Sequence, residues 1–285
     1  MAIGIDRGEV LHPLEVELLC AFAEVSAPFP LEIPSAGETE VERMVLYQGA
    51  REMLSERGLA DDAGPLGVAD DFVYLLRNAT GAVDLVLAKE KTTFGAVVLA
   101  YRSDALLVTQ DFTEVDRLVR MKAITLDDAV DELIRLVPTV APSPGAPFNL
   151  PRRAVEAVFQ EILKRAPESG HDAALSDMDT TVEIRPPQQM RTEELEDLLA
   201  GHGIEERVGR RMVANLQPVL GSGQTGVAKR DQTEDQWHRA GDELRWLDTP
   251  RGRFRLAEDG EWISVNPLAG DEIRSTFRSL AATIR

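Results

Sequence analysis

The spacing of apolar residues along the first 80 positions predicts three helices. Over 13–25 apolar side chains recur every three or four positions, which is the period of an amphipathic helix. These side chains are Leu14, Leu18, Leu19, Phe22 and Val25. Prolines at 28, 30 and 34 then require an extended connection. A second helix is expected over 38–57, with Met44, Tyr47 and Leu54 on one stripe and Gly58 ending it, and a third over 67–78.

The next segments alternate with a period of two, which predicts strands. Runs of this kind lie at 82–90, 92–102, 105–110 and 114–121. Thr125 then caps a helix that extends to about 137. Residues 138–149 contain four prolines and no charge, so we expect a linker there. A helix follows, and the polar stretch 166–190 is expected to be a mobile loop.

The second part of the chain repeats this order of helices, strands and one final helix. Helices are expected at 192–201, 204–217 and 268–284, and strands at 225–231, 235–240, 243–248, 252–257 and 261–266. Even the turns at 102–106 and 239–244 are similar. Two related halves sharing one sheet would explain the repetition, and a chance similarity of short strand patterns is the alternative.

Charge and composition exclude several classes of protein. The chain has 285 residues, with 31 basic and 49 acidic side chains and a net charge of −18. This balance argues against a nucleic-acid partner and against an anionic membrane surface. No apolar run approaches the ~18 residues of a membrane span, and the N-terminus lacks a secretory signal. One cysteine excludes an internal disulfide. We therefore expect a soluble, cytoplasmic protein.

Motifs that carry chemistry are weak in this sequence. Residues 221–226 fit G-x-G-x-x-G, but a helix precedes them and a strand follows, the reverse of a dinucleotide site. We expect a flexible helix-to-strand turn there. Residues 177–181 fit D-x-D-x-T without the apolar strand that a phosphatase nucleophile needs. The four histidines are dispersed. The sequence thus predicts no catalytic residue, no cofactor and no metal, and favours a binding protein.

A turn near the C-terminus is expected to form a rigid hairpin corner. Pro250 and Gly252 are turn formers, and Asp248 can accept hydrogen bonds from Arg251 or Arg253. This corner belongs to the run Trp-Leu-Asp-Thr at 246–249, which is followed by Arg-Gly-Arg-Phe at 251–254, the strand DGEWISVNP at 259–267 and the closing helix.

That stretch resembles the C-terminal signature of the EspG family, the cytosolic chaperones of actinobacterial type VII secretion. The segments at 40–59 and 85–110 are also similar to the family. The resemblance implies an α+β fold in which a central, mostly antiparallel sheet is flanked by two helical bundles. It implies one domain over 1–285 with two pseudo-symmetric halves, 1–137 and 191–285, joined by the linker, helix and mobile loop of 138–190.

The resemblance further implies the function and the partner. EspG proteins bind the PPE subunit of PE–PPE heterodimers at its apolar helical tip, keep the pair soluble and deliver it for secretion, with no reaction and no cofactor. Their partner surface maps here onto one loop, two helices and part of the sheet. The residues are Lys89, Glu90, Lys91, Thr92, Thr93, Leu195, Leu198, Ile204, Val208, Arg211, Met212, Val227 and Lys229.

Two other functions remain open at this stage. A small-molecule enzyme on the same two-half fold would need a deep pocket with convergent polar groups. A homo-oligomeric scaffold would pair its apolar helix faces with a second copy, so a homodimer is possible. The stripe of Ile204, Val208 and Met212 could equally pack the protein's own core.

Overall fold

The computed structural model describes residues 8–89, 92–102, 104–165, 192–231 and 236–285, which form eight helices and ten strands. In chain order the first elements are β1 (Glu9–Leu11), α1 (Pro13–Ala23), α2 (Glu40–Glu56), α3 (Val68–Asn78), β2 (Gly81–Lys89), β3 (Thr92–Tyr101), β4 (Asp104–Asp111), β5 (Val119–Thr125) and α4 (Leu126–Leu136). The remaining elements are β6 (Phe148–Pro151), α5 (Arg152–Arg165), α6 (Thr192–Gly201), α7 (Glu206–Leu216), β7 (Gly221–Asp231), β8 (Gln236–Thr249), β9 (Gly252–Asp259), β10 (Trp262–Pro267) and α8 (Gly270–Ala282).

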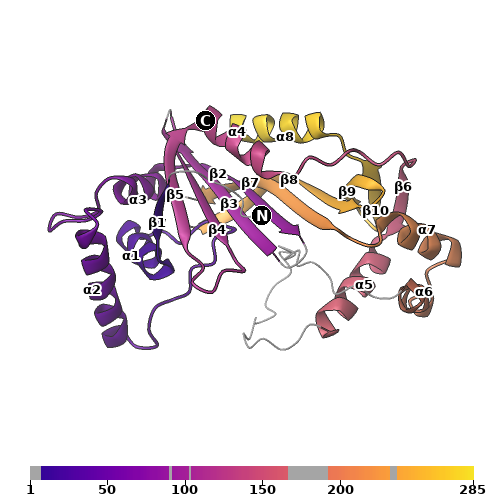
Figure 1. Ribbon diagram of the computed structural model, residues 1–285, viewed down its shortest axis with the longest axis horizontal. Coiled ribbons are helices and arrows are strands. Elements are labelled where there is room, and N and C mark those ends of the chain that lie inside the picture. The colour runs from indigo at the N-terminus through magenta and orange to yellow at the C-terminus, as the bar shows by residue number, and fades with distance from the viewer. Residues whose placement is uncertain (1–7, 90–91, 103, 166–191, 232–235) are drawn as a thin grey trace.

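All ten strands belong to one sheet, in the order β1-β5-β4-β3-β2-β7-β8-β9-β10-β6. Every paired neighbour runs antiparallel. The pair β2–β7 lies at the centre, where Gly81 is opposite Lys229 and Lys89 is opposite Gly221. The expected α+β fold with a central antiparallel sheet is confirmed (Figure 1).

The described elements follow the same order twice along the chain. One strand, three helices, four strands and one helix occur from β1 to α4 and again from β6 to α8. The second series therefore begins at β6, before the 191 boundary that the sequence suggested. That the two series arose by duplication stays a prediction.

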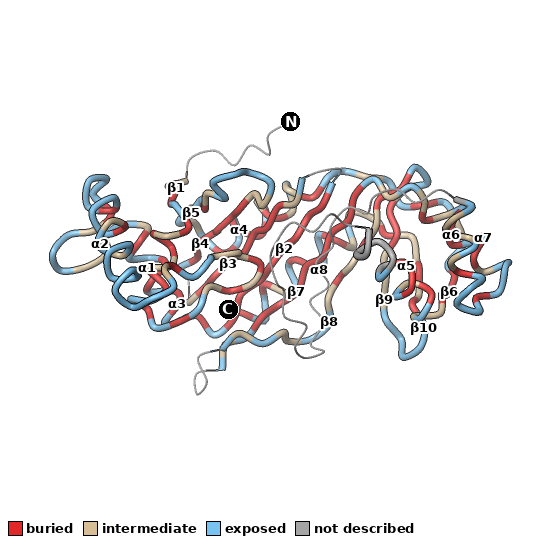
Figure 2. Tube along the Cα trace, turned by 90° about the horizontal axis from the view of Figure 1, so that it is seen from below, coloured by how far each residue is buried: buried red, intermediate tan, exposed pale blue. Residues whose placement is uncertain are grey.

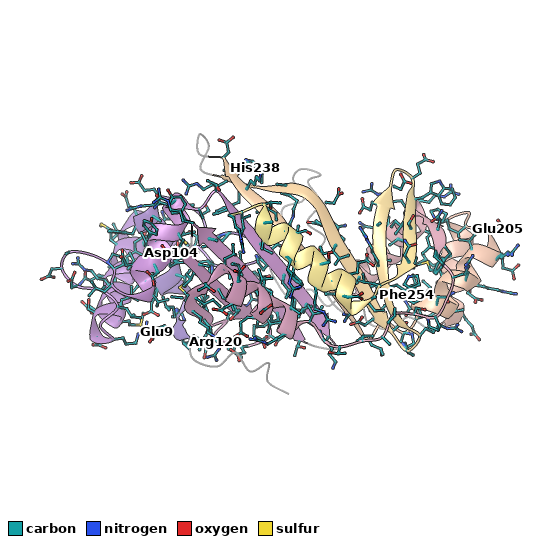
Figure 3. The ribbon with its side chains drawn as sticks, turned by 90° about the horizontal axis from the view of Figure 1, so that it is seen from above. Glu9, Asp104, Arg120, Glu205, His238 and Phe254 are labelled. Carbon is teal, nitrogen blue, oxygen red and sulfur yellow. The ribbon has the colours of Figure 1, made fainter. Side chains whose placement is uncertain are left out.

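One face of the sheet, here called the upper face, is covered by α4 and α8. Val83, Leu85 and Leu87 of β2 point to this face and pack with Leu133 of α4 and Phe277 of α8. Alternation along the strand sends every second side chain to the same side. Figure 3 shows α8 lying across the strands on this face.

The opposite, lower face is covered at its two ends by different helices. Ala82, Val97 and Leu99 pack with α1 and α3 at one end. Phe148, Phe254 and Val265 pack with α5, α6 and α7 at the other end. Between these two helical groups Figure 2 shows the buried central strands of the sheet.

The predicted second helix is present, but its expected buried stripe is partly wrong. Leu54 is buried, whereas Met44 is 61% exposed. The helix packs through Ala50 and Leu54, and Thr39 caps its start together with Glu42. Met44 lies outside that packing face because, at about 100° per residue, it is turned well away from both positions.

The strand expected at 114–121 lies instead at Val119–Thr125. Residues 112–118 form a turn in which Arg117 has a positive φ of 44° and Val115 is 98% exposed. The residues expected to form two strands over 235–248 form one strand, β8, which pairs with β7 across a bulge between Thr225 and Val227. The similarity of 239–244 to the turn at 102–106 is therefore not structural. The loop expected at 166–190 lies outside the described residues.

The segment expected to be a linker at 138–149 is anchored to the sheet. The amide of Arg253 donates to the carbonyl of Ala141, and the amide of Ser143 donates to the carbonyl of Arg253. Residues from Phe148 onward form the edge strand β6, which pairs with β10. Proline and the lack of charge indicated a loop, but they do not indicate whether its backbone is paired.

Candidate partner-binding surface

The β2–β3 hairpin brings three of the predicted contact residues to one end of the central strands. Lys89 ends β2 and is opposite Thr92 in β3. The Thr92 hydroxyl donates to the Lys89 carbonyl at 2.8 Å. Lys89 and Thr92 are exposed, and Thr93 is half-buried. Glu90 and Lys91 lie outside the described residues.

The connection from α7 to β7 reaches the same end of the sheet. Gly221, the first residue of β7, is opposite Lys89 on one side and Asp248 on the other. Leu220 precedes it, and its amide donates to the Asp248 carbonyl at 2.8 Å. The Leu220 side chain is 46% exposed. Sequence reasoning missed this residue, although its apolar side chain in a short helix-to-strand connection was a usable signal.

The apolar stripe of α6 and α7 packs the protein's own core. Leu195, Ile204 and Met212 are buried, and Leu198 and Val208 pack partly buried against them. The same cluster contains Phe148 and Phe254, whose rings meet edge to face. Of the two alternatives for this stripe, the structure therefore has the core packing. Figure 3 shows Phe254 on the sheet and Glu205 at the outer end of α7.

The remaining predicted contacts do not lie together. Arg211 is exposed, places its guanidinium carbon 4.7 Å from the centre of the Phe148 ring and donates to the Pro147 carbonyl. Val227 is buried on the upper face, against the α4 and α8 side of the sheet. Lys229 is exposed but lies opposite Gly81, at the far end of β2 from Lys89. At about 3.3 Å per residue, the two lysines are roughly 26 Å apart.

The hairpin corner at 248–253 is held by a buried ion pair between Asp248 and Arg253. The Arg253 guanidinium donates to both carboxylate oxygens of Asp248 at 2.6 and 2.8 Å, and to the Pro138 carbonyl at 3.0 Å. Arg253, and not Arg251, is thus the bidentate partner, while Pro250 and Arg251 are exposed in the turn. Gly252 has a φ of 108° and touches the backbone of Ser143 so closely that a Cβ would lie 2.8 Å from its nitrogen.

Charged side chains cross the lower face from the centre of the sheet to α5. Asp84 of β2 pairs with Arg239 of β8. The chain of ion pairs continues through Glu243 to Arg245, at 2.5 and 2.6 Å. Arg245 then contacts Glu258 of β9 at 2.9 Å, which contacts Arg152 of α5 at 3.4 Å. These alternating charges connect the central strands to the C-terminal helices.

Asp84 is fully buried at the start of that chain. Burial raises the pKa of Asp84 from 3.8 to about 7, and the Arg239 guanidinium lowers it in part. One of its carboxylate oxygens has no hydrogen-bond partner among the described residues, and the same holds for the side-chain oxygen of buried Gln224. Asp84 therefore holds a proton at pH values where an exposed aspartate is ionised.

The glycine-rich run at 221–226 is a buried strand, which corrects the flexible turn expected from the sequence. It is paired on both sides, with β2 and with β8. A Cβ at Gly223 would lie 2.1 Å from Cζ2 of Trp246. Glycine is therefore required by the close approach of the indole ring, and the fit to a dinucleotide motif is coincidental.

Two further features are absent from the part of the chain that the structure describes, residues 8–89, 92–102, 104–165, 192–231 and 236–285. Within these ranges, no three histidine, cysteine, aspartate or glutamate side chains lie together as metal ligands. None of the described helices is both long and apolar enough to cross a bilayer.

Comparison with known families identifies the chain. The model of the EspG family matches residues 12–278, nearly the whole length. The chain belongs to the EspG family. The matched region includes the hairpin end, α7 and the corner at Asp248.

This EspG family member is also similar to a solved structure. That structure is the Mycobacterium tuberculosis type VII secretion system chaperone EspG5 in complex with a PE25–PPE41 dimer. The TM-score is 0.57 at 10% sequence identity, over 98% of this chain and 97% of that chain. At this identity the similarity shows a shared fold. No curated protein matches the sequence.

Proposed function

We propose that this EspG family member is a cytoplasmic secretion chaperone that binds PE–PPE heterodimers through the helical tip of the PPE subunit. The observation that carries the proposal is the family match over 12–278. The fold similarity to EspG5, whose solved complex contains PE25–PPE41, supports it. In this role the chaperone binds and releases its partner without any reaction or cofactor.

The surface proposed for the partner is the hairpin end of the sheet. It consists of the segment from Lys89 to Thr93, which includes Glu90 and Lys91, together with Leu220 beside it. Leu220 supplies exposed apolar area for an apolar tip, and the lysines supply a charged rim. Arg211 lies apart from this surface, against Phe148 of the edge strand β6, and is not part of it. Leu195, Ile204 and Met212 belong to the core and hold α6 and α7 against the C-terminal end of the sheet.

The net charge of −18 suits this function. A chaperone that covers an apolar tip must itself remain soluble at high concentration, and a large net charge opposes association between copies.

Co-expression with candidate PE–PPE pairs tests the proposal. The expected result is that an otherwise insoluble pair becomes soluble and co-purifies with this protein. Leu220→Glu should reduce capture at least tenfold without changing the melting temperature. Leu66→Glu is the matched control, because Leu66 is 41% exposed and lies in the connection before α3. Lys89→Glu should weaken capture, and Lys229→Glu should not.

Three results would count against the proposal in different ways. Failure to solubilise any pair from a type VII system would contradict the chaperone function. Capture that survives Leu220→Glu and Lys89→Glu would contradict only the proposed surface. Equal loss of capture in the Lys229→Glu variant would contradict the limits of the proposed surface, because Lys229 lies at the far end of β2 from Lys89.

A further inference from the structure

A row of apolar side chains faces solvent along the N-terminal half of α2. Val41 and Val45 are each 67% exposed, and Met44 is 61% exposed. The helix is attached to the protein through Ala50 and Leu54, which are buried. Val41 and Val45 each precede one of these residues by nine positions, or about 180° around a helix. The two valines therefore point directly away from the body of the protein.

The same outward face continues without obstruction into the next turns. Gly49 is the next small residue along it, and a Cβ built there would meet no atom within 4 Å. Glu52 and Glu56 follow on this side. The helix start is already fixed, because Thr39 accepts from the Glu42 amide and the Glu42 carboxylate accepts from the Thr39 amide. A partner would thus meet a preformed helix with an apolar half and an acidic half.

The charged side chains on α2 indicate the sign of the charge that a partner must carry. Glu40 and Glu56 form no ion pair among the described residues, and Glu52 only accepts from the Gln48 amide at 2.8 Å. The two arginines of the helix are already engaged elsewhere. Arg43 donates to the Ala36 carbonyl at 3.2 Å, and Arg51 lies 3.7 Å from Asp62.

We propose that this outward face of α2 binds an amphipathic helix of a partner protein whose apolar residues cover Val41 and Val45. The partner helix carries lysine or arginine beside Glu52 and Glu56. Packing of apolar stripes supplies the affinity, and opposite charge selects the partner. A second copy of this chain is disfavoured as occupant because it would bring the same carboxylates and another net charge of −18.

The site is separate from the hairpin surface. In Figure 1, α2 lies at one end of the molecule, and its Leu54 packs in the cluster that contains Ala82 and Leu99. Ala82 and Leu99 are opposite each other, seven positions along β2 and β3 from Lys89 and Thr92. Occupation of α2 therefore leaves the hairpin end free, and the inference does not depend on what binds there. Two helical turns cover less than the ~800 Å² per partner of a standard interface, so we expect weak, reversible binding.

Two synthetic helical peptides with an identical leucine stripe test the inference on the full chain. One carries lysine on both sides of the stripe and the other carries glutamate. The lysine peptide should bind saturably in a fluorescence anisotropy titration, and the glutamate peptide should not. Val45→Glu, and separately Glu52→Lys with Glu56→Lys, should weaken binding about tenfold. Val115→Glu is the matched control, because Val115 is 98% exposed in the β4–β5 turn.

Several outcomes would overturn the inference. A scrambled lysine peptide that binds equally well would mean non-specific attraction to an acidic protein. Binding unchanged by Val45→Glu would place the site elsewhere. Dimerisation of the wild type in sedimentation velocity, abolished by Val45→Glu, would make a second copy the occupant. Val45→Glu should leave the melting temperature unchanged; if it does not, Val41→Gln tests the same face with a smaller perturbation.

Discussion

Replacing Gly223 with alanine tests the packing at the centre of the sheet. The added Cβ would lie 2.1 Å from Cζ2 and 2.4 Å from Cε2 of Trp246. The indole ring cannot move freely, since Trp246 is 1% exposed and the Arg253 guanidinium lies 5.5 Å from its ring centre. Overpacking of a well-packed core costs about 1–3 kcal/mol. Because the overlap here involves several ring atoms, we expect Gly223→Ala to cost about 3 kcal/mol.

Equilibrium unfolding in urea measures this cost, with Gly49→Ala as the control. Gly49 is also a glycine in regular structure, but a Cβ there meets open space. Alanine at this helical position should raise the free energy of unfolding by about 1 kcal/mol. The two substitutions add the same methyl group, and their effects on stability are expected to have opposite signs.

A double-mutant cycle with Trp246→Leu completes the test. The single Trp246→Leu change should cost several kcal/mol through lost burial. In that background Gly223→Ala should cost almost nothing, which gives a coupling energy of about 3 kcal/mol. If Gly223→Ala alone does not fold, the double variant should fold better than the single one. A single variant as stable as wild type, or strictly additive changes, would refute the reasoning.

Two further predictions concern buried charge. Because the pKa of Asp84 is about 7 when folded and 3.8 ordinarily, the folded state holds a proton that the unfolded state loses, so this group's contribution to stability falls as pH rises toward 7. One unit of pKa shift corresponds to ~1.4 kcal/mol, so the free energy of unfolding of Asp84→Asn, relative to that of wild type, should rise by about 3 kcal/mol between pH 5 and pH 8. Urea unfolding of both proteins at both pH values measures this difference. A difference that is the same at both pH values would contradict the raised pKa. Arg253→Ala leaves the buried Asp248 carboxylate unpaired and should cost about 3–5 kcal/mol. Arg253→Ala should also speed proteolytic cleavage within 138–147. Cleavage of the variant at the wild-type rate would show that other contacts hold this segment.

The helices were the most predictable part of the fold. Helices α1 and α8 were both predicted from a period of 3.6 residues, and Ile273 and Phe277 of α8 are buried as expected. The expected stripe of α1 is partly wrong, because its buried face runs through Val16, Leu19 and Ala23, whereas Phe22 is 46% exposed. Strands β2, β3 and β4 were also found, because their alternating side chains are packed on both faces of the sheet. Boundaries failed where the turn residues carried no strong signal, as between Asp111 and Val119.

The central strand β7 could not be predicted in full from the sequence. Its first six residues, Gly221 to Gly226, contain no large apolar side chain, so neither hydrophobic periodicity nor β-propensity marks a strand there. The space above Gly223 is filled by a side chain 23 positions further along, Trp246 of the neighbouring strand. Such a pairing depends on tertiary structure and leaves no local pattern.

The candidate partner surface shows a similar limit. Sequence spacing correctly indicated that Ile204, Val208 and Met212 share one face of a segment, but spacing cannot indicate whether that face meets a partner or the protein's own core. Burial decides that it is core. The exposed apolar residues, Leu220 at the hairpin end and Val45 on α2, lie in places that no periodicity distinguishes.

The arrangement at the hairpin end determines which variants can report on partner binding. Gly221 is opposite Lys89 on one side and Asp248 on the other, so the proposed surface and the buried ion pair share one row of the sheet. A change at Asp248 or Arg253 would both disturb this row and lower the stability of the protein. Loss of capture in such a variant would therefore not show that the substituted residue contacts the partner. Leu220 and Lys89 are exposed beside this row, so a change at either residue can lower capture without lowering the melting temperature.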